Sequence, residues 1–233
     1  MRTKSGAYYE LVEAMSQPGC PICRLVDRAV RQYVDVFFYE NITNVERRAE
    51  IRAARGYCSA HGALLAGHAR MLGVAIVQHD VINDVLREMN RLLPEAHARR
   101  LWLIGASLRR ALLDAIRPKR ICPLCEYERD QERVLLHALT DAIHDESLRR
   151  AFAGSSGLCL PHVQILLQMR GLSTDRLRLL LQIERDILTT LKADLEEYLA
   201  KSNGSYDYRG MGKEADSPLR AIKLVSGRVL GRR

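Results

Sequence analysis

The sequence predicts an all-α protein, a helical bundle built from an internal duplication in which each half is stapled by one Cys3His metal site. Two observations support the fold class and one supports the duplication. Apolar residues recur at helical spacing through most of the chain, and no segment shows the two-residue alternation of a β-strand. All six cysteines fall into two copies of one pattern, so the same unit is encoded twice.

The cysteine pattern predicts two metal ions. The first copy joins Cys20 and Cys23 to Cys58 and His61, and the insert 24–57 has 34 residues. The second copy repeats this order after an insert, 126–158, of 33 residues, and its four ligands are Cys122, Cys125, Cys159 and His162. Three thiolates and one imidazole are the ligand set of a closed tetrahedral zinc site. Because each copy holds a complete set, we expect each site to be built within its own repeat.

Other interpretations of the cysteines stay open at this stage. Three cysteines and a histidine can hold an iron–sulfur cluster, and the spacing does not exclude one. A Cys-Pro-x-Cys redox site would need a βαβ context that the sequence lacks. A catalytic zinc ion would need an open coordination position, which four strong ligands do not leave.

Helical periodicity sets the expected order of elements. We expect helices near 24–40, 44–54, 74–93, 96–116, 126–143 and 174–200, the last with Glu184 interrupting its apolar seam. The two repeats then cover residues 1–94 and 95–200. Residues 201–233 are expected to form a basic tail, which begins as a flexible linker and ends either as a short basic amphipathic helix or as a disordered segment.

The net charge of +8 is concentrated in two segments. Residues 99–120 hold seven basic residues and one acid, and residues 201–233 hold eight basic residues and three acids. Such clusters favour an anionic partner, either nucleic acid or an acidic protein, with a membrane surface as a further partner for the tail. The simpler interpretation is that residues 99–120 form a solvent-exposed helix face and that residues 201–233 form a disordered tail. The candidate anion-binding residues are Arg99, Arg100, Arg109, Arg110, Lys119, Arg120, Arg220, Lys223, Arg228, Arg232 and Arg233.

The expected compartment is the cytoplasm. The N-terminal residues show no signal-peptide pattern, and no apolar run is long enough to span a membrane. Thiols stay reduced in the cytosol and are then available as metal ligands.

With both motifs in view, the chain resembles a family of uncharacterised bacterial and archaeal proteins with duplicated CPxC…GxCxxH units. The resemblance implies a metal-binding helical protein and brings no established activity. We find no catalytic constellation in the sequence, so an enzymatic role is uncertain and not favoured. The leading hypothesis is a zinc-stabilised helical protein that acts as a binding or adaptor module. The second hypothesis within this class is nucleic-acid recognition through the basic segments. The alternative is an iron–sulfur redox or electron-transfer protein.

Overall fold

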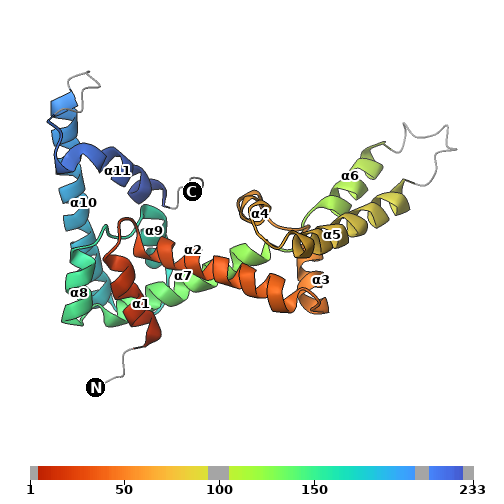
Figure 1. Cartoon of the computed structure of the whole chain (residues 1–233), viewed down its shortest axis with the longest axis horizontal. Helices are drawn as coiled ribbons and strands as arrows, with labels where there is room; N and C mark the ends of the chain where they lie inside the picture. The colour runs from red at the N-terminus through yellow and green to blue at the C-terminus, as the bar shows by residue number, and fades with distance from the viewer. Residues whose placement is uncertain (1–4, 94–104, 203–209, 228–233) are drawn as a thin grey trace. The chain divides into compact units, whose positions relative to one another are not determined.

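The computed structural model describes residues 5–93, 105–202 and 210–227. Within these ranges the chain forms eleven α-helices and contains no β-strand, so the all-α prediction is confirmed (Figure 1). No helix in the described ranges is long and apolar enough to cross a lipid bilayer.

The helices group into two compact units. Unit 1 combines Met1–Ala29 with Asp130–Arg233, and unit 2 is Val30–Arg129. The division passes through two long helices, α2 and α7, which carry the chain from unit 1 into unit 2 and back again. The units therefore do not follow the repeat boundary between residues 94 and 95, and that boundary stays a prediction about sequence duplication.

The two repeats use their helices in the same order: a long helix, a short capped helix, a helix that starts at a cysteine, and a second long helix. The bounds in the first half are α1 Gly6–Met15, α2 Pro21–Val36, the π-helical turn η1 Phe37–Asn41, α3 Val45–Ala53, α4 Ser59–Ala66 and α5 Met71–Leu92. The second half contains α6 Gly105–Ile116, α7 Pro123–Ala142, α8 Glu146–Ala153, α9 Leu160–Gln168 and α10 Thr174–Ser202.

Equivalent side chains start the short helices of the two repeats. In unit 2 the Asn44 side chain accepts a hydrogen bond from the backbone N–H of Arg47 and caps α3. In unit 1 the Asp145 carboxylate caps α8 in the same way, at 3.1 Å from the N atom of Leu148. Asp145 also accepts a hydrogen bond of 2.7 Å from the Tyr8 hydroxyl, which ties α1 to α8. Asn44 thus caps its own helix, whereas Asp145 both caps α8 and links it to α1.

Each unit has its own apolar core. In unit 1 the fully buried side chains come from α1, α2, α7, α8, α9, α10 and the segments between them, and Phe152 is the largest. In unit 2, Phe37 and Phe38 are buried and stack edge to face at 5.0 Å. Gly73, in the first turn of α5, lies so close to Phe38 that a Cβ there would come within 2.8 Å of the ring. Any side chain at residue 73 would therefore force either the Phe38 ring or α5 to shift.

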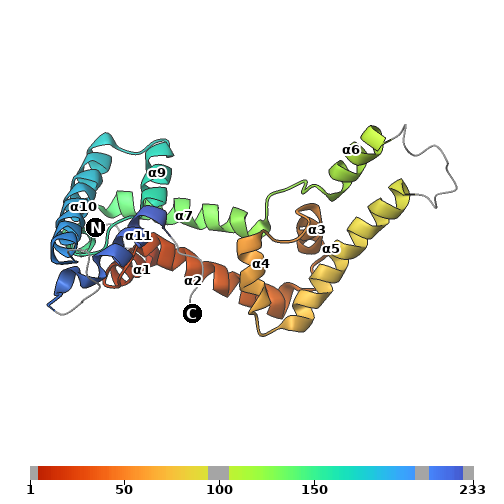
Figure 2. The ribbon, with the colours of Figure 1, turned by 90° about the horizontal axis from the view of Figure 1, so that it is seen from above.

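The described part of the basic tail is helical. A short 3-10 turn, η3 (Lys213–Asp216), leads into α11, which runs from Ser217 to Ser226 and packs on α10 and α9 (Figure 1 and Figure 2). Ser217 and Leu224 are buried, and Arg220 donates a hydrogen bond to Asp194 of α10. Of the two predicted forms of the tail, the short helix is the one present over these residues.

Candidate metal centres

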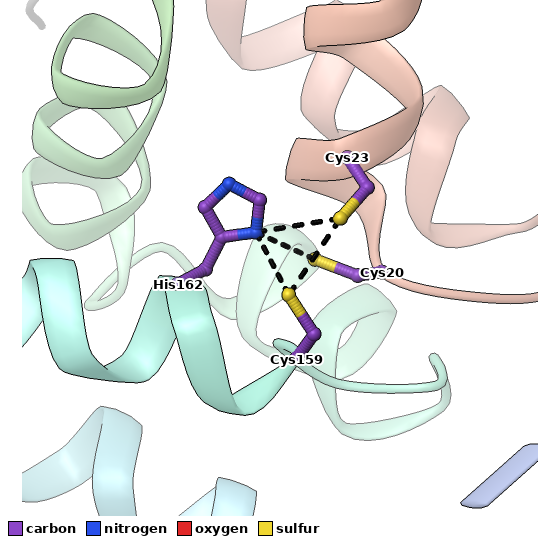
Figure 3. Close-up of side chains that lie close together, drawn as sticks. All are labelled: Cys20, Cys23, Cys159 and His162. Carbon is purple, nitrogen blue, oxygen red and sulfur yellow. Dashed lines mark hydrogen bonds between the residues drawn. The ribbon is translucent and has the colours of Figure 1, made fainter. Parts of the chain in front are cut away.

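Unit 1 holds one cluster of three cysteines and a histidine, which we call site A. Cys20 and Cys23 come from the start of α2, and Cys159 and His162 come from the start of α9. Figure 3 shows the three sulfur atoms gathered around Nδ1 of His162. The distance from Nδ1 to Sγ is 3.4 Å for Cys20, 3.5 Å for Cys23 and 3.0 Å for Cys159. The four side chains face a common centre, as the ligands of one ion do.

Unit 2 holds the equivalent cluster, site B. Its ligands are Cys58 and His61 from the start of α4 and Cys122 and Cys125 from the start of α7. The sulfur atoms lie 3.2, 3.5 and 3.5 Å from Nδ1 of His61. All eight residues that the sequence marks as metal ligands are thus gathered into two clusters.

The pairing of the two half-motifs differs from the prediction. We expected Cys20 and Cys23 to share an ion with Cys58 and His61, but the structure gathers them with Cys159 and His162. Each compact unit has one site, and each site takes its ligands from both repeats. The physical reason lies in α2, whose 16 residues span about 24 Å along the helix axis. The helix carries the chain out of unit 1, so the second half of the same motif folds in the other unit.

The spacing of the donor atoms fits a single tetrahedral ion. Within each cluster the four ligand atoms all lie within 4.8 Å of one another, and one sulfur–sulfur pair in each is 3.5 or 3.6 Å apart. With Zn–S bonds of about 2.3 Å and Zn–N bonds of about 2.0 Å, tetrahedral geometry separates ligand atoms by roughly 3.5 to 3.8 Å. The short contacts within the clusters, 3.0 to 3.6 Å, are close to these values.

All four half-motifs begin a helix with a cysteine. Cys58 and Cys159 are the N-cap residues of α4 and α9. Cys20 and Cys122 hold the same place before α2 and α7, because their carbonyl groups accept the first i+4 backbone hydrogen bonds of those helices. Two helix N-termini therefore converge on each cluster, and their partial positive charge stabilises thiolate ligands.

The pKa values of the side chains in site B indicate which protons a metal ion must displace when it binds. Burial raises the pKa of Cys122, but hydrogen bonds from His61 and from backbone N–H groups outweigh it and lower that pKa to about 6. Burial lowers the pKa of His61, yet contacts with Cys122 and Glu128 raise it to about 10. Burial and the neighbouring Cys58 raise the pKa of Cys125 to about 12. At neutral pH the incoming ion therefore displaces protons from His61 and Cys125, which makes binding pH-dependent.

The histidine of each cluster has a carboxylate on the side away from the sulfur atoms. Nε2 of His61 lies 3.2 Å from Oε1 of Glu128, and Nε2 of His162 lies 3.4 Å from Oε1 of Glu132. Both glutamates belong to α7 and are four residues apart. A carboxylate in this place holds the histidine with Nδ1 free for the metal. The arrangement is looser in site A, where Nε2 of His162 is buried and makes no hydrogen bond within the described residues.

A buried glutamate supports the chain segment that leads into site A. Oε2 of Glu184 accepts a hydrogen bond of 2.9 Å from the backbone N–H of Leu158, next to Cys159. Burial raises the pKa of Glu184 to about 7. Gly157 has a φ of +73°, which residues with a side chain rarely adopt, and a Cβ there would come within 2.7 Å of Glu184. Both the backbone conformation and the close approach of Glu184 therefore require glycine at this position. Glu184, the acid that interrupts the apolar seam of α10, thus holds the segment that precedes Cys159 through a hydrogen bond.

The candidate anion-binding residues divide into three groups. Arg120 pairs with Glu50 and Glu126, and Arg220 pairs with Asp194 and Asp216, so acids already offset both charges. Exposed members without an ion pair among the described residues are Arg109, Arg110, Lys119 and Lys223. The remaining candidates, Arg99, Arg100, Arg228, Arg232 and Arg233, lie outside the described residues.

Comparisons with known proteins find a family and a relative, and neither description names an activity. The model of a family of unknown function, DUF6062, matches residues 9–231. A curated relative from Caldicellulosiruptor sp. (strain Rt8B.4), described as an uncharacterized 23.9 kDa protein in the xynA 3′ region, is 22% identical over 207 residues. The match covers 86% of this chain and 89% of the relative. No solved structure matches the chain.

Paired substitutions test how the ligands are shared. Cys20→Ser combined with Cys159→Ser removes two ligands of site A, so we expect the purified protein to lose one of its two metal ions. Cys20→Ser combined with Cys58→Ser damages both sites, and we expect both ions to be lost. Metal content by mass spectrometry of the desalted protein gives the result. The opposite outcome, two ions lost in the first variant and one in the second, would restore pairing within each repeat.

Glu128→Gln tests the carboxylate behind His61. Removing its charge weakens the orientation of the imidazole, so we expect the metal affinity of site B to fall about 10-fold or more. Competition with a chromophoric chelator measures the change, and site A should keep its affinity. Glu126→Gln, an exposed neighbour on the same helix that pairs with Arg120, is the matched control. Equal affinities in the wild type and Glu128→Gln would show that this carboxylate does not support the ligand.

Proposed function

The chain belongs to the family of unknown function DUF6062, and on that premise we propose that it is a zinc-stabilised helical protein that acts as a binding or adaptor module. The observation that carries the proposal is the convergence of four strong donor atoms in each unit. Four such ligands complete a tetrahedral shell and leave no position for a substrate or a reactive water, which favours a structural ion over a catalytic one.

The ligand spacing favours zinc over an iron–sulfur cluster. In a cluster the protein ligands bind different iron atoms, so their sulfur atoms must lie farther apart than ligands that share one ion. Here one imidazole nitrogen lies within 3.5 Å of all three sulfur atoms in each site. Thiolate and imidazole ligands in tetrahedral array are also a set that zinc prefers. A reducing, cytoplasmic setting is part of this proposal, because the thiols must not be oxidised.

The energetic role of the ions follows from the sequence distance that they bridge. Cys23 and Cys159 are 136 positions apart, and Cys58 and Cys125 are 67 positions apart. A structural zinc ion contributes about 10–16 kcal/mol of apparent binding free energy. A typical domain is stable by only about 5–15 kcal/mol. Each unit of this protein therefore depends on its ion to hold its helix starts together.

A specific observation favours nucleic acid as the partner. Arg109 and Arg110 are adjacent and exposed on α6, and within the described residues they form no ion pair with an acid. Cations that acids do not offset are available to phosphate groups. Lys119 is also exposed and follows the same helix. We therefore extend the proposal to binding of RNA or DNA through α6.

Metal removal tests the structural role. We expect two zinc ions per chain, and chelation should lower helicity by circular dichroism and lower the melting temperature, because the binding energy is folding energy here. Restoring zinc should reverse both changes. Protein isolated without oxygen that is brown and contains iron with labile sulfide would support the redox alternative. Unchanged helicity and melting temperature after complete chelation would rule out a structural role.

Salt dependence tests nucleic-acid binding. We expect generic RNA or DNA to bind at low salt, with affinity falling by about 0.7–0.9 log units per log of salt for each phosphate neutralised. Arg109→Gln with Arg110→Gln should weaken binding and reduce that slope. Arg150→Gln with Arg185→Gln removes the same charge from two highly exposed arginines elsewhere and serves as the control. If neither RNA nor DNA binds at micromolar protein concentration, the nucleic-acid proposal is wrong, and an acidic protein or an anionic membrane is the next partner to test.

A further inference from the structure

The C-terminal helix α11 ends against a cysteine of site A. Gly227, the residue that follows α11, is buried, and a Cβ there would lie 3.3 Å from Sγ of Cys159 and 3.4 Å from Cγ of Pro161. Its φ of +76° is one that residues with a side chain rarely adopt. Glycine at this position therefore allows the backbone of the tail to lie directly on a sulfur atom of the cluster.

Two buried acids hold the tail on α10. Glu214 of η3 is 1% exposed, and its carboxylate accepts a hydrogen bond of 2.7 Å from Nζ of Lys201 in the last turn of α10. Asp194 of α10 is 5% exposed and accepts a hydrogen bond of 3.0 Å from Arg220 of α11. From these contacts α11 runs to α9, where site A begins (Figure 1). The helix is thus fastened to the body of unit 1 before it reaches the cluster.

Site A is more enclosed than site B. In site A, Cys159 has no exposed surface, Cys20 is 7% exposed, and Cys23 is partly exposed. In site B two cysteines, Cys58 and Cys125, are partly exposed. The two clusters share one ligand set, so the difference in exposure comes from the chain that surrounds each of them.

Helix α11 also borders the space next to Cys20. A cavity of about 660 Å³ lies between α10, α11 and the loops that precede α2 and α9, and Cys20 is on its wall. Leu219 and Leu224 of α11 line the same cavity. If α11 left its place, the cavity would open to solvent beside Cys20, and Cys159 would lose the cover of Gly227. The helix therefore limits access to two of the three sulfur atoms of site A.

We propose that α11 is a lid over site A, so that the metal ions of the two sites exchange with solution at different rates. The proposal rests on the proposed function, because it takes zinc to be the bound ion. A competing ligand must reach the cluster to remove its ion, and the surrounding shell controls that access. Site B offers two partly exposed thiolates, whereas site A opens fully only when α11 detaches. Because a docked helix detaches from a native protein only by local unfolding, site A keeps its ion and site B is the exchangeable site.

Chelator competition on the metal-loaded full chain tests the difference between the sites. After mixing with an excess of a chromophoric chelator, we expect one zinc ion to leave quickly and the other at least about 10-fold more slowly. The rate of the slow phase should level off as the chelator concentration rises, because opening of α11 becomes limiting. Cys58→Ser, which damages site B, should retain the slow phase, and Cys159→Ser should retain the fast one. Release of both ions in one phase would overturn the proposal.

A substitution under α11 tests the lid itself. Leu224 is 5% exposed, so Leu224→Asp should detach α11 and accelerate the slow phase at least about 10-fold without changing the fast phase. Ile222→Asp places the same charge on the same helix at a residue that is 53% exposed, and should leave both phases unchanged. A slow phase that keeps its wild-type rate in Leu224→Asp would contradict the lid.

A milder substitution covers the case in which Leu224→Asp does not fold, as judged by circular dichroism. Arg220→Ala removes the hydrogen bond to Asp194 and leaves the apolar contacts of α11 in place. It should accelerate the slow phase by a smaller factor, and an unchanged rate would again contradict the lid. Metal analysis of the starting protein separates the two proposals. Iron in place of zinc would refute the proposed function and this inference with it, whereas two zinc ions released at one rate would refute only the lid.

Discussion

The structure depends on helix N-termini that meet at a cluster of cysteine side chains. Four helices, α2, α4, α7 and α9, each begin immediately after a cysteine, and they meet in pairs at the two sites. Without an ion, three thiols and an imidazole packed together gain little, because each must keep or share protons. A divalent cation replaces those protons and binds all four donor atoms of the cluster at once. The same contact fixes the directions of two helices in each unit.

The interleaving of the repeats has a consequence for folding. Site A cannot form until the chain has been made as far as His162, although its first ligands are Cys20 and Cys23. Site B closes earlier, when Cys125 is available. Contacts between residues so far apart carry a larger loop-closure cost than local ones, and they slow folding. A metal ion bound at each cluster would offset that cost, and each cluster takes its four residues from both repeats.

The fold class and the eight residues of the two Cys3His clusters could be predicted from the sequence because both signals are local. Helical periodicity can be seen in residues that are three or four positions apart. Each half-motif, C-x2-C or C-x2-H, spans only four residues at the start of one helix. The pairing was predicted wrongly because a pattern gives the number of ligands and not the path of the chain between them. Here a helix of 16 residues, α2, separates the two halves of the first motif. Glu128 and Glu132 gave no separate signal, since they look like any charged face of a helix, whereas Glu184 stood out as an acid in an apolar seam.

The central claim is that each metal ion joins segments from both repeats. Anomalous scattering from crystals of the metal-loaded protein, recorded at the absorption edge of the bound metal, tests it most directly. We expect two anomalous peaks in the chain, one enclosed by Cys20, Cys23, Cys159 and His162 and the other by Cys58, His61, Cys122 and Cys125. A peak enclosed by Cys20, Cys23, Cys58 and His61 would contradict it.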